Sequence, residues 1–115
     1  MSKHGNSLEN ENPHHLYEIR DLAENDVFKY GISDDPIEED QLSDRIRDQL
    51  YYLNLSSGWV RYIGRIIRTD IAGRVSARQV EEEYIETYLK ENVKRPKGNP
   101  LCRKSNFDPP FPENI

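Results

Sequence analysis

Residues 15–33 read HLYEIRDLAENDVFKYGIS, and this stretch decides the fold. Leu16 to Arg20 has the period of a strand, with Leu16, Glu18 and Arg20 on one face and Tyr17 and Ile19 on the other. Turn-forming residues follow over 21–26, and Val27–Ser33 is a second strand-like run. The stretch therefore predicts a β-hairpin whose second strand carries a cation, Lys29, two residues before Gly31.

The chain beyond the hairpin adds a helix, a strand and a second helix. Residues 41–53 have apolar side chains at helical spacing, namely Leu42, Ile46, Leu50 and Leu53. Residues 59–68 are rich in β-formers, and Ser76 is suited to cap a helix that continues to about Glu91. The order predicts a small α+β domain in which helices flank a three-stranded antiparallel sheet.

Composition and charge exclude several classes of protein. The 115 residues contain one cysteine, so the chain has no internal disulfide. No apolar run approaches the roughly 18 residues of a membrane span, and no signal-peptide core is present. The net charge of −5 hides a split, because residues 1–60 hold 5 Lys and Arg against 13 Asp and Glu, whereas residues 61–115 hold 11 against 8. The basic half is therefore the place to look for contacts with an anionic partner.

The distribution of polar, turn-forming and proline residues divides the chain into three parts. Residues 1–13 are polar and turn-rich and are expected to form a flexible lead-in, residues 14–104 form the globular domain, and residues 105–115 form an extended Pro-rich tail. The acidic run DDPIEED at 34–40 is expected to be a solvated loop. The adjacent pair His14 and His15 is not expected to bind one metal ion, because neighbouring side chains on a strand point to opposite faces.

Two charged residues stand on helix faces that the pattern marks as apolar. Glu81 shares the inward face of the second helix with Val80, Tyr84 and Ile85. Burial of a carboxylate is costly unless a cation, a metal or a hydrogen-bond network meets it. Arg45 flanks the apolar stripe of the first helix, four residues before Gln49.

Five positions in order resemble the GIY-YIG nucleases. Tyr17 stands on the first strand, the second motif ends at Gly31, and an Arg, a Glu and an Asn follow at Arg45, Glu81 and Asn99. The resemblance covers about residues 15–100 and is nearest to the compact nuclease domains of bacterial polymorphic toxins. It implies the GIY-YIG fold and makes Tyr17, Lys29, Arg45, Glu81 and Asn99 the catalytic set.

The second motif and the helix Arg leave alternatives open. Most members of the family carry Tyr two residues before the second-motif Gly, where this chain has Lys29, so Tyr30 is the alternative. Arg47 is the alternative to Arg45. If Gly31 admits the substrate, Lys29 is the side chain beside it. A literal Tyr62-Ile63-Gly64 lies on the third strand and is interpreted as a coincidence.

The resemblance implies a metal-dependent endonuclease. Glu81 would hold one divalent ion, Mg²⁺ with Mn²⁺ as the alternative. Arg45 would clamp the phosphate, and Tyr17, with Lys29 nearby, would position and deprotonate water. Asn99 would order the site rather than react. The expected substrate is DNA in preference to RNA, with low sequence specificity, bound by basic side chains that include Arg65, Arg68, Arg74 and Lys97.

The resemblance also implies a biological setting. An interbacterial toxin domain is delivered and acts in the cytoplasm of the target cell, and a cognate immunity protein would cover its active site. The alternative is a non-catalytic α+β interaction module, such as an immunity or adaptor protein that keeps a degenerate nuclease fold. Under that alternative, Glu81→Ala would change stability and abolish no activity.

Overall fold

The sheet and its two helices follow the order that the sequence predicts. A computed structural model describes residues 9–100. The elements are β1 (Pro13–Asp21), β2 (Asp26–Ser33), α1 (Asp44–Ser57), β3 (Tyr62–Ala72) and α2 (Gly73–Asn92). The strands form one sheet in the order β2-β1-β3, and both pairings are antiparallel. The predicted α+β fold with a three-stranded antiparallel sheet is therefore confirmed.

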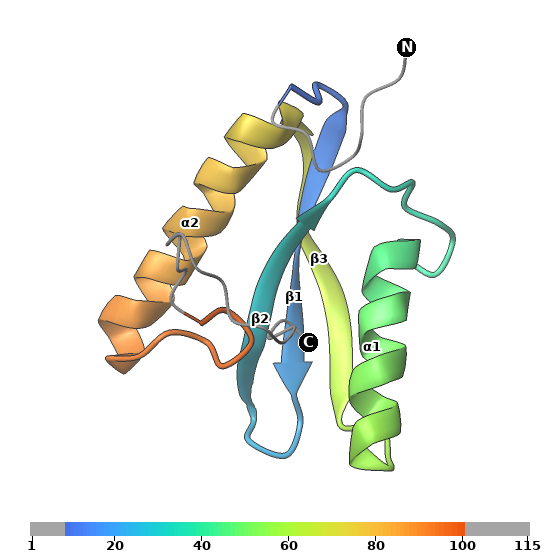
Figure 1. The fold of residues 1–115 in the computed structure, drawn as a ribbon, viewed down its shortest axis with the longest axis vertical. Helices are drawn as coiled ribbons and strands as arrows, with labels where there is room; N and C mark the ends of the chain where they lie inside the picture. Colours follow the sequence, from blue (N-terminus) through green and yellow to red (C-terminus); the bar gives the residue numbers. More distant parts are fainter. Residues whose placement is uncertain (1–8, 101–115) are drawn as a thin grey trace, which may run out of the picture.

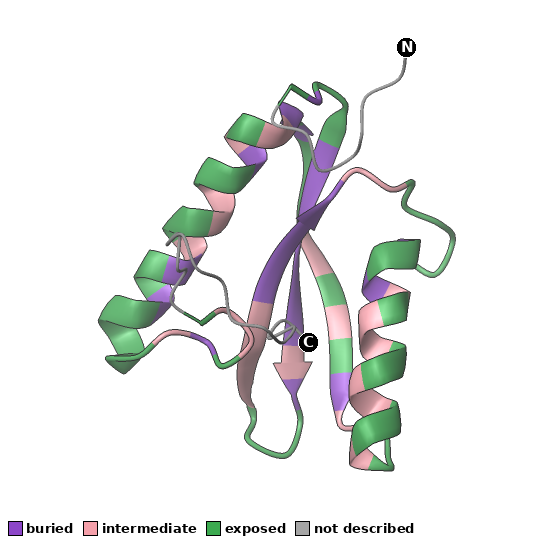
Figure 2. Cartoon of the chain, viewed as in Figure 1, coloured by how far each residue is buried: buried purple, intermediate pink, exposed green. Residues whose placement is uncertain are grey.

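The helices pack on opposite faces of the sheet, as Figure 1 shows with the sheet seen nearly edge-on between them. The alternation of β1 explains this arrangement. Leu16 belongs to the core under α2, together with Tyr30 of β2. Tyr17 and Ile19 belong to the core under α1. Since both faces of β1 are covered, almost the whole strand is buried (Figure 2).

Three predicted boundaries were wrong by a few residues. Helix α1 covers Asp44–Ser57 instead of 41–53, and it ends where Gly58 takes the left-handed conformation with φ 80°. Strand β3 covers Tyr62–Ala72 instead of 59–68. Helix α2 starts at Gly73, not after a cap at Ser76, because Gly73 with φ 84° turns the chain directly from β3 into the helix.

Residues ahead of β1 pack against the start of α2. Asn10 is buried, its carbonyl oxygen accepts a hydrogen bond from Arg74 N at 2.9 Å, and its side chain donates to Asp34 Oδ2 at 3.0 Å. The packed part of the chain thus begins ahead of residue 14. The predicted Pro-rich tail at 105–115 and most of the predicted lead-in lie outside the described residues. Neither helix within residues 9–100 combines the length and the apolar character that crossing a membrane requires.

Candidate active site

Tyr17 lies at the middle of β1 and faces α1. Its side chain is fully buried, and its hydroxyl donates a hydrogen bond to Gln49 Oε1 at 3.0 Å. Gly31 is its partner on β2, and a Cβ at Gly31 would lie only 2.4 Å from Tyr17 Cζ and Oη. The sequence suggested that Gly31 admits the substrate. The structure gives another reason for this glycine, because the Tyr17 ring occupies the space of a side chain.

The phenol of Tyr17 is held in its protonated form. Burial raises the pKa of Tyr17, and the nearby positive charge of Arg45 only partly opposes that rise. Arg45 stands in the first turn of α1, where its backbone N–H donates to Asp35 Oδ2 at 3.0 Å. The side chains of Tyr17 and Arg45 therefore come together at one place, as the site prediction requires.

Lys29 lies on the same face of the sheet as Tyr17. Lys29 pairs with Ile19 on β1, and it is only partly exposed. Burial lowers the pKa of Lys29, the charge of Arg45 lowers it further, and the charge of Glu81 opposes both. A lysine that merely guards an exposed strand edge would lie in water instead.

Tyr30, the alternative to Lys29, points to the other face. It is buried in the core under α2, with its ring centroid 5.6 Å from that of Tyr84. Its register partner is Glu18, whereas the partner of Lys29 is Ile19. The geometry thus brings Lys29, and not Tyr30, to the face that carries Tyr17.

Glu81 brings the negative charge of the site from α2. Burial raises the pKa of its carboxyl, and the positive charges of Arg78, Lys29 and Arg74 oppose the rise. Among residues 9–100 the Glu81 carboxylate has no hydrogen bond or ion pair with another side chain.

The first turns of α2 contribute two more cations. Arg74, Arg78 and Glu81 follow one another at helical spacing on one face of α2. Burial lowers the pKa of Arg74, as do the charges of Arg78 and Arg45. Both arginines belong to the basic half in which the sequence predicts nucleic-acid contacts. The charge of the Glu81 carboxylate is thus opposed by cations from β2 and α2, and Arg45 of α1 acts on Lys29 and Arg74.

A divalent ion would find one protein carboxylate here. Within residues 9–100 no group of three or more His, Cys, Asp or Glu side chains could hold a metal. His14 Nδ1 lies 2.7 Å from the Asn12 carbonyl oxygen, and His15 Nε2 lies 3.0 Å from Ser43 Oγ, so the two rings have different partners. Glu81 fits a hard ion such as Mg²⁺ that keeps several waters and takes its other oxygens from a phosphate.

Asn99 binds the backbone of β2. Its side chain accepts a hydrogen bond from Tyr30 N at 2.8 Å and donates one to the Tyr30 carbonyl oxygen at 3.0 Å. The preceding Gly98 donates its N–H to the Phe28 carbonyl oxygen at 2.7 Å. The loop after α2 therefore runs along the free edge of β2 on both sides of Lys29 (Figure 1).

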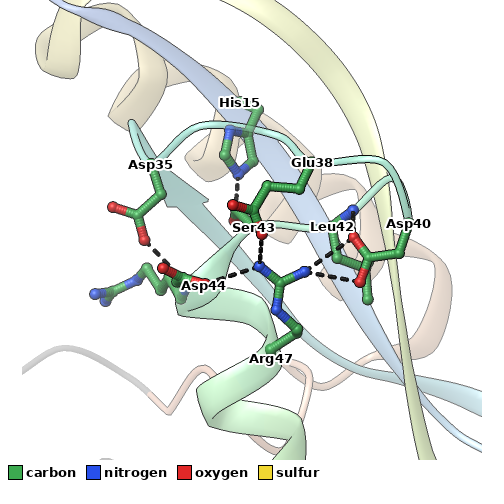
Figure 3. Close-up of polar contacts among 9 residues, drawn as sticks. His15, Asp35, Glu38, Asp40, Leu42, Ser43, Asp44 and Arg47 are labelled. Carbon is green, nitrogen blue, oxygen red and sulfur yellow. Dashed lines mark hydrogen bonds and ion pairs between the residues drawn. The ribbon is translucent and has the colours of Figure 1, made fainter.

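Arg47, the alternative to Arg45, is engaged elsewhere. Its guanidinium donates to Asp40 at 2.7 and 2.9 Å, to Asp44 at 2.7 Å and also to Glu38. Figure 3 shows this side chain between the acidic loop and the start of α1. Arg47 thus fastens the acidic loop to the helix and lies apart from Tyr17.

Three of the four predicted substrate-binding residues are not gathered at this site. Arg65 and Arg68 pair with Glu18 and Leu16, which places them on the face opposite Tyr17. Arg65 also donates to Glu18 Oε2 at 2.8 Å. Lys97 lines a hollow at the hairpin end of the sheet together with three acidic residues, Asp21, Glu24 and Asp26.

The literal Tyr62-Ile63-Gly64 has a packing role. Tyr62 is buried under α1, and its ring centroid lies 5.0 Å from that of Phe28. A Cβ at Gly64 would lie 2.7 Å from Ile46 Cγ2, so this glycine lets α1 approach β3. The interpretation of the tripeptide as a coincidence agrees with this packing.

Comparison with known families decides the identity of the chain. The sequence profile of a family described as URI fold toxin 2 matches residues 7–93. The chain belongs to this family. Searches among curated proteins and among solved structures returned no match. In this URI fold toxin the matched region contains Tyr17, Lys29, Arg45 and Glu81, and it ends before Asn99.

Proposed function

We propose that this URI fold toxin is a metal-dependent endonuclease of the GIY-YIG type. The single observation that supports the proposal is that the charges of Arg45 and Glu81 both act on Tyr17 and on Lys29, two buried or partly buried groups whose pKa values are shifted. These side chains come from four different elements and are separated by up to 64 positions in the chain. Such perturbed ionisable groups at one place are typical of a catalytic site.

Phosphodiester hydrolysis needs the groups that meet here. A water oxygen forms a bond to phosphorus while the opposite ester P–O bond breaks, and charge builds up on the phosphate oxygens. Arg45 neutralises that charge through its guanidinium fork. A divalent ion held by Glu81 would supply Lewis-acid stabilisation of the phosphate and of the leaving oxygen.

Lys29 and Tyr17 divide the work on the attacking water. Burial raises the pKa of Tyr17 and lowers that of Lys29, so it disfavours the phenolate and favours the neutral amine. Neutral Lys29 accepts the water proton, and Tyr17 accepts a hydrogen bond from the same water and orients it. The ammonium then gives its proton to solvent, and the leaving oxygen takes a proton from water.

The substrate of the proposed nuclease is nucleic acid, DNA in preference to RNA. Three cations act on the Glu81 carboxyl, and Arg45 acts on two of them, so the set favours a polyanion; its members are Lys29, Arg45, Arg74 and Arg78. The sequence contains no recognisable base-reading motif, so we expect low sequence specificity. Affinity should fall as the salt concentration rises.

Membership in a toxin family supports the proposed setting. A toxin that cleaves nucleic acid would be delivered into a target cell and would act in the target-cell cytoplasm. The producing cell would need a cognate immunity protein. Such a protein would compete with phosphate for the cationic site, so acidic side chains at its surface are expected.

The test is cleavage of supercoiled plasmid by the purified chain with Mg²⁺ or Mn²⁺. Glu81→Ala should lower the cleavage rate by at least about 100-fold. The matched control is Glu83→Ala, since Glu83 is exposed on the same helix. Absence of cleavage by the unaltered chain in both metals would contradict the proposal and favour a non-catalytic module.

A further inference from the structure

Strand β3 forms one edge of the sheet, and every second residue of an edge strand turns its backbone groups outward. In an antiparallel pair, residues whose N–H and C=O bond the neighbouring strand alternate with residues whose groups point away from it. Leu22 N donates to the Arg61 carbonyl oxygen at 2.7 Å, which sets Arg61 among the inward residues. The pairing of β1 with β3 is regular over 62–66. The outward residues of this stretch are therefore Tyr62, Gly64 and Ile66.

Two asparagine side chains cover outward residues on the two edges of the sheet. Asn54 of α1 accepts a hydrogen bond from Tyr62 N at 2.8 Å and donates one to the Tyr62 carbonyl oxygen at 3.0 Å. Asn99 makes the same pair of bonds with Tyr30 on β2. Each amide thus takes the place of a neighbouring strand. Within residues 9–100 neither a strand nor a side chain does this for the two outward residues of β3 that follow Tyr62.

A hollow of about 290 Å³ lies beside this uncovered part of the edge. Its lining comes from β3 and from the acidic loop, and it includes Gly64, Ile66, Ile37 and Leu42. Leu42 and Ile66 also pack against the core under α1, so the hollow lies on the α1 side of the sheet. Asp40 lines it as well, and the Arg47 guanidinium binds that carboxylate. The hollow can therefore receive an apolar side chain of a strand that is added at this edge.

Arg65 stands between the two uncovered residues and points to the other face of the sheet. Its side chain is 70% exposed and forms an ion pair with Glu18 at 2.8 Å. A guanidinium has five N–H donors, so Arg65 can bind a second carboxylate. An added strand would set one side chain directly across from Arg65 and two side chains on the α1 face, beside the hollow. The edge therefore fits a strand with the pattern apolar, acidic, apolar.

A second copy of the chain fits this edge poorly. The register that satisfies the uncovered groups of both copies pairs Gly64 of one copy with Ile66 of the other. That register sets the two Arg65 side chains directly opposite each other, and like charges in this position are destabilising. The charge on β3 thus favours a different protein.

We propose that the edge of β3 at Gly64 and Ile66 is a docking surface for a partner protein. The partner adds an extended segment of the pattern apolar, acidic, apolar as a fourth, antiparallel strand of the sheet. Main-chain hydrogen bonds give affinity in this mode of binding, and alternate side chains give specificity. Lys29 lies on β2, at the opposite edge of the sheet, so the docking surface is separate from the proposed active site. The inference does not depend on nuclease activity.

The test measures hydrogen exchange of single backbone amides in the full chain by NMR. The probe is a cyclised β-hairpin peptide whose free edge strand reads Thr-Val-Glu-Val-Thr, since a preformed strand loses less entropy on binding. In the chain alone, the amides of Gly64 and Ile66 should exchange at least about tenfold faster than that of Tyr62, which Asn54 holds. A saturating amount of the hairpin should slow both amides at least about tenfold.

Two altered hairpins serve as controls. Methylation of the two valine nitrogens keeps every side chain and removes the outward N–H donors, so this hairpin should not protect Gly64 or Ile66. Replacement of the glutamate by lysine keeps the donors and sets a like charge across from Arg65. This change should weaken binding at least about threefold.

Several outcomes would overturn the docking surface. Slow exchange of Gly64 and Ile66 in the monomeric chain would mean that the edge is already covered. Absence of protection by the unmodified hairpin contradicts the proposal, and so does equal protection by the methylated hairpin. Protection in the chain alone, together with a dimer in sedimentation, would assign the edge to a second copy. Equal binding of the glutamate and lysine hairpins would contradict the acidic position of the pattern.

Discussion

At the scale of single residues, the proposed site depends on close contacts that leave no space for extra atoms. Tyr17 is buried between Gly31 and α1, and its hydroxyl oxygen is fixed by Gln49. Gly31 has an ordinary extended position in β2, so its value lies in the missing side chain. The glycine is therefore a requirement for placing the Tyr17 ring.

Gly31→Ala should displace the Tyr17 ring and destroy cleavage. A methyl group 2.4 Å from the ring carbon has no room, and overpacking of this kind costs about 1–3 kcal/mol of folding free energy. Urea unfolding and plasmid cleavage measure the two effects. Gly64→Ala is the matched control, because its Cβ would meet Ile46 away from Tyr17. Gly64→Ala should lose stability and keep cleavage when folded, and full cleavage by Gly31→Ala would contradict the placement of Tyr17.

The partly buried charge of Glu81 should lower the free energy of unfolding at neutral and higher pH. Burial raises the pKa of Glu81 above its unfolded value, so the folded state binds more protons. The protonated Glu81 carboxyl makes its full contribution to the free energy of unfolding below the pKa that Glu81 has in the unfolded chain. This contribution is lost as the pH rises through the higher pKa of Glu81 in the folded protein. Glu81→Gln, which imitates the protonated form, should be more stable than the unaltered chain by about 1 kcal/mol at pH 8 and about equal to it at low pH.

Thermal melts across pH measure this difference, and a gain of about 1 kcal/mol would raise Tm by about 4–8 °C. Glu83→Gln serves as the control, since Glu83 is exposed on α2 and should show no such pH-dependent gain. Loss of stability in Glu81→Gln at pH 8 would mean that the carboxylate stabilises the fold, and the metal-binding role would then lose its support.

At the scale of elements, the start of α1 separates two arginines with different tasks. Arg45 and Arg47 are two positions apart on the helix, so they point about 200° apart. Arg47 joins the acidic loop to α1 through Glu38 and Asp40, and it also pairs with Asp44 of the same helix. Arg45 acts on Tyr17 and Lys29. The acidic loop thereby fixes the helix that presents Arg45.

Arg45→Ala and Arg47→Ala should differ in whether they lower the cleavage rate. Loss of the Arg45 guanidinium should lower the cleavage rate by about 100-fold or more with little change in stability. Loss of Arg47 should change the stability little, because its carboxylate partners are exposed, and cleavage should continue. Urea unfolding and the plasmid assay separate the two. The reverse pattern would assign the phosphate to Arg47.

The elements themselves were largely predictable, and their ends were not. Strand alternation at Leu16 and helical spacing at Ile46 and Ile85 correctly gave the order of elements and the buried faces. Ser76 was a misleading cap signal, since the conformation of Gly73 begins α2 earlier. Propensity cannot place such an end, because it depends on how β3 meets the helix in three dimensions.

At the scale of the whole molecule, the fold decides which charges act together. Sequence reasoning grouped Arg65 and Arg68 with Arg74 because all belong to the basic half. The register of β3 places Arg65 and Arg68 on the face opposite Tyr17, and of these three arginines Arg74 is the one whose charge acts on Glu81. A period of two cannot be counted through the bulges in the β1–β3 pairing, so the sequence alone could not assign these faces.

The same limit applies to contacts made by residues that the sequence analysis already marked. Gln49 was noted for its helical spacing from Arg45, and Arg78 belongs to the basic half, but only the structure shows that they approach the Tyr17 hydroxyl and the Glu81 carboxylate. Lys29, in contrast, was visible in the sequence as a cation in an apolar strand. Its partial burial beside Arg45 and Glu81 is what sets it apart from an ordinary lysine on a strand edge.

The most direct test of the proposed site is the single-turnover rate of plasmid cleavage by Lys29→Met at neutral pH with Mg²⁺. Methionine keeps the apolar stem and removes the amine, so the variant should fold and should cleave at least about 100-fold more slowly. Lys90→Met, which alters an exposed lysine of α2, should cleave at the rate of the unaltered chain. Full activity in Lys29→Met would contradict the proposed site and would leave Lys29 as an ordinary residue of β2.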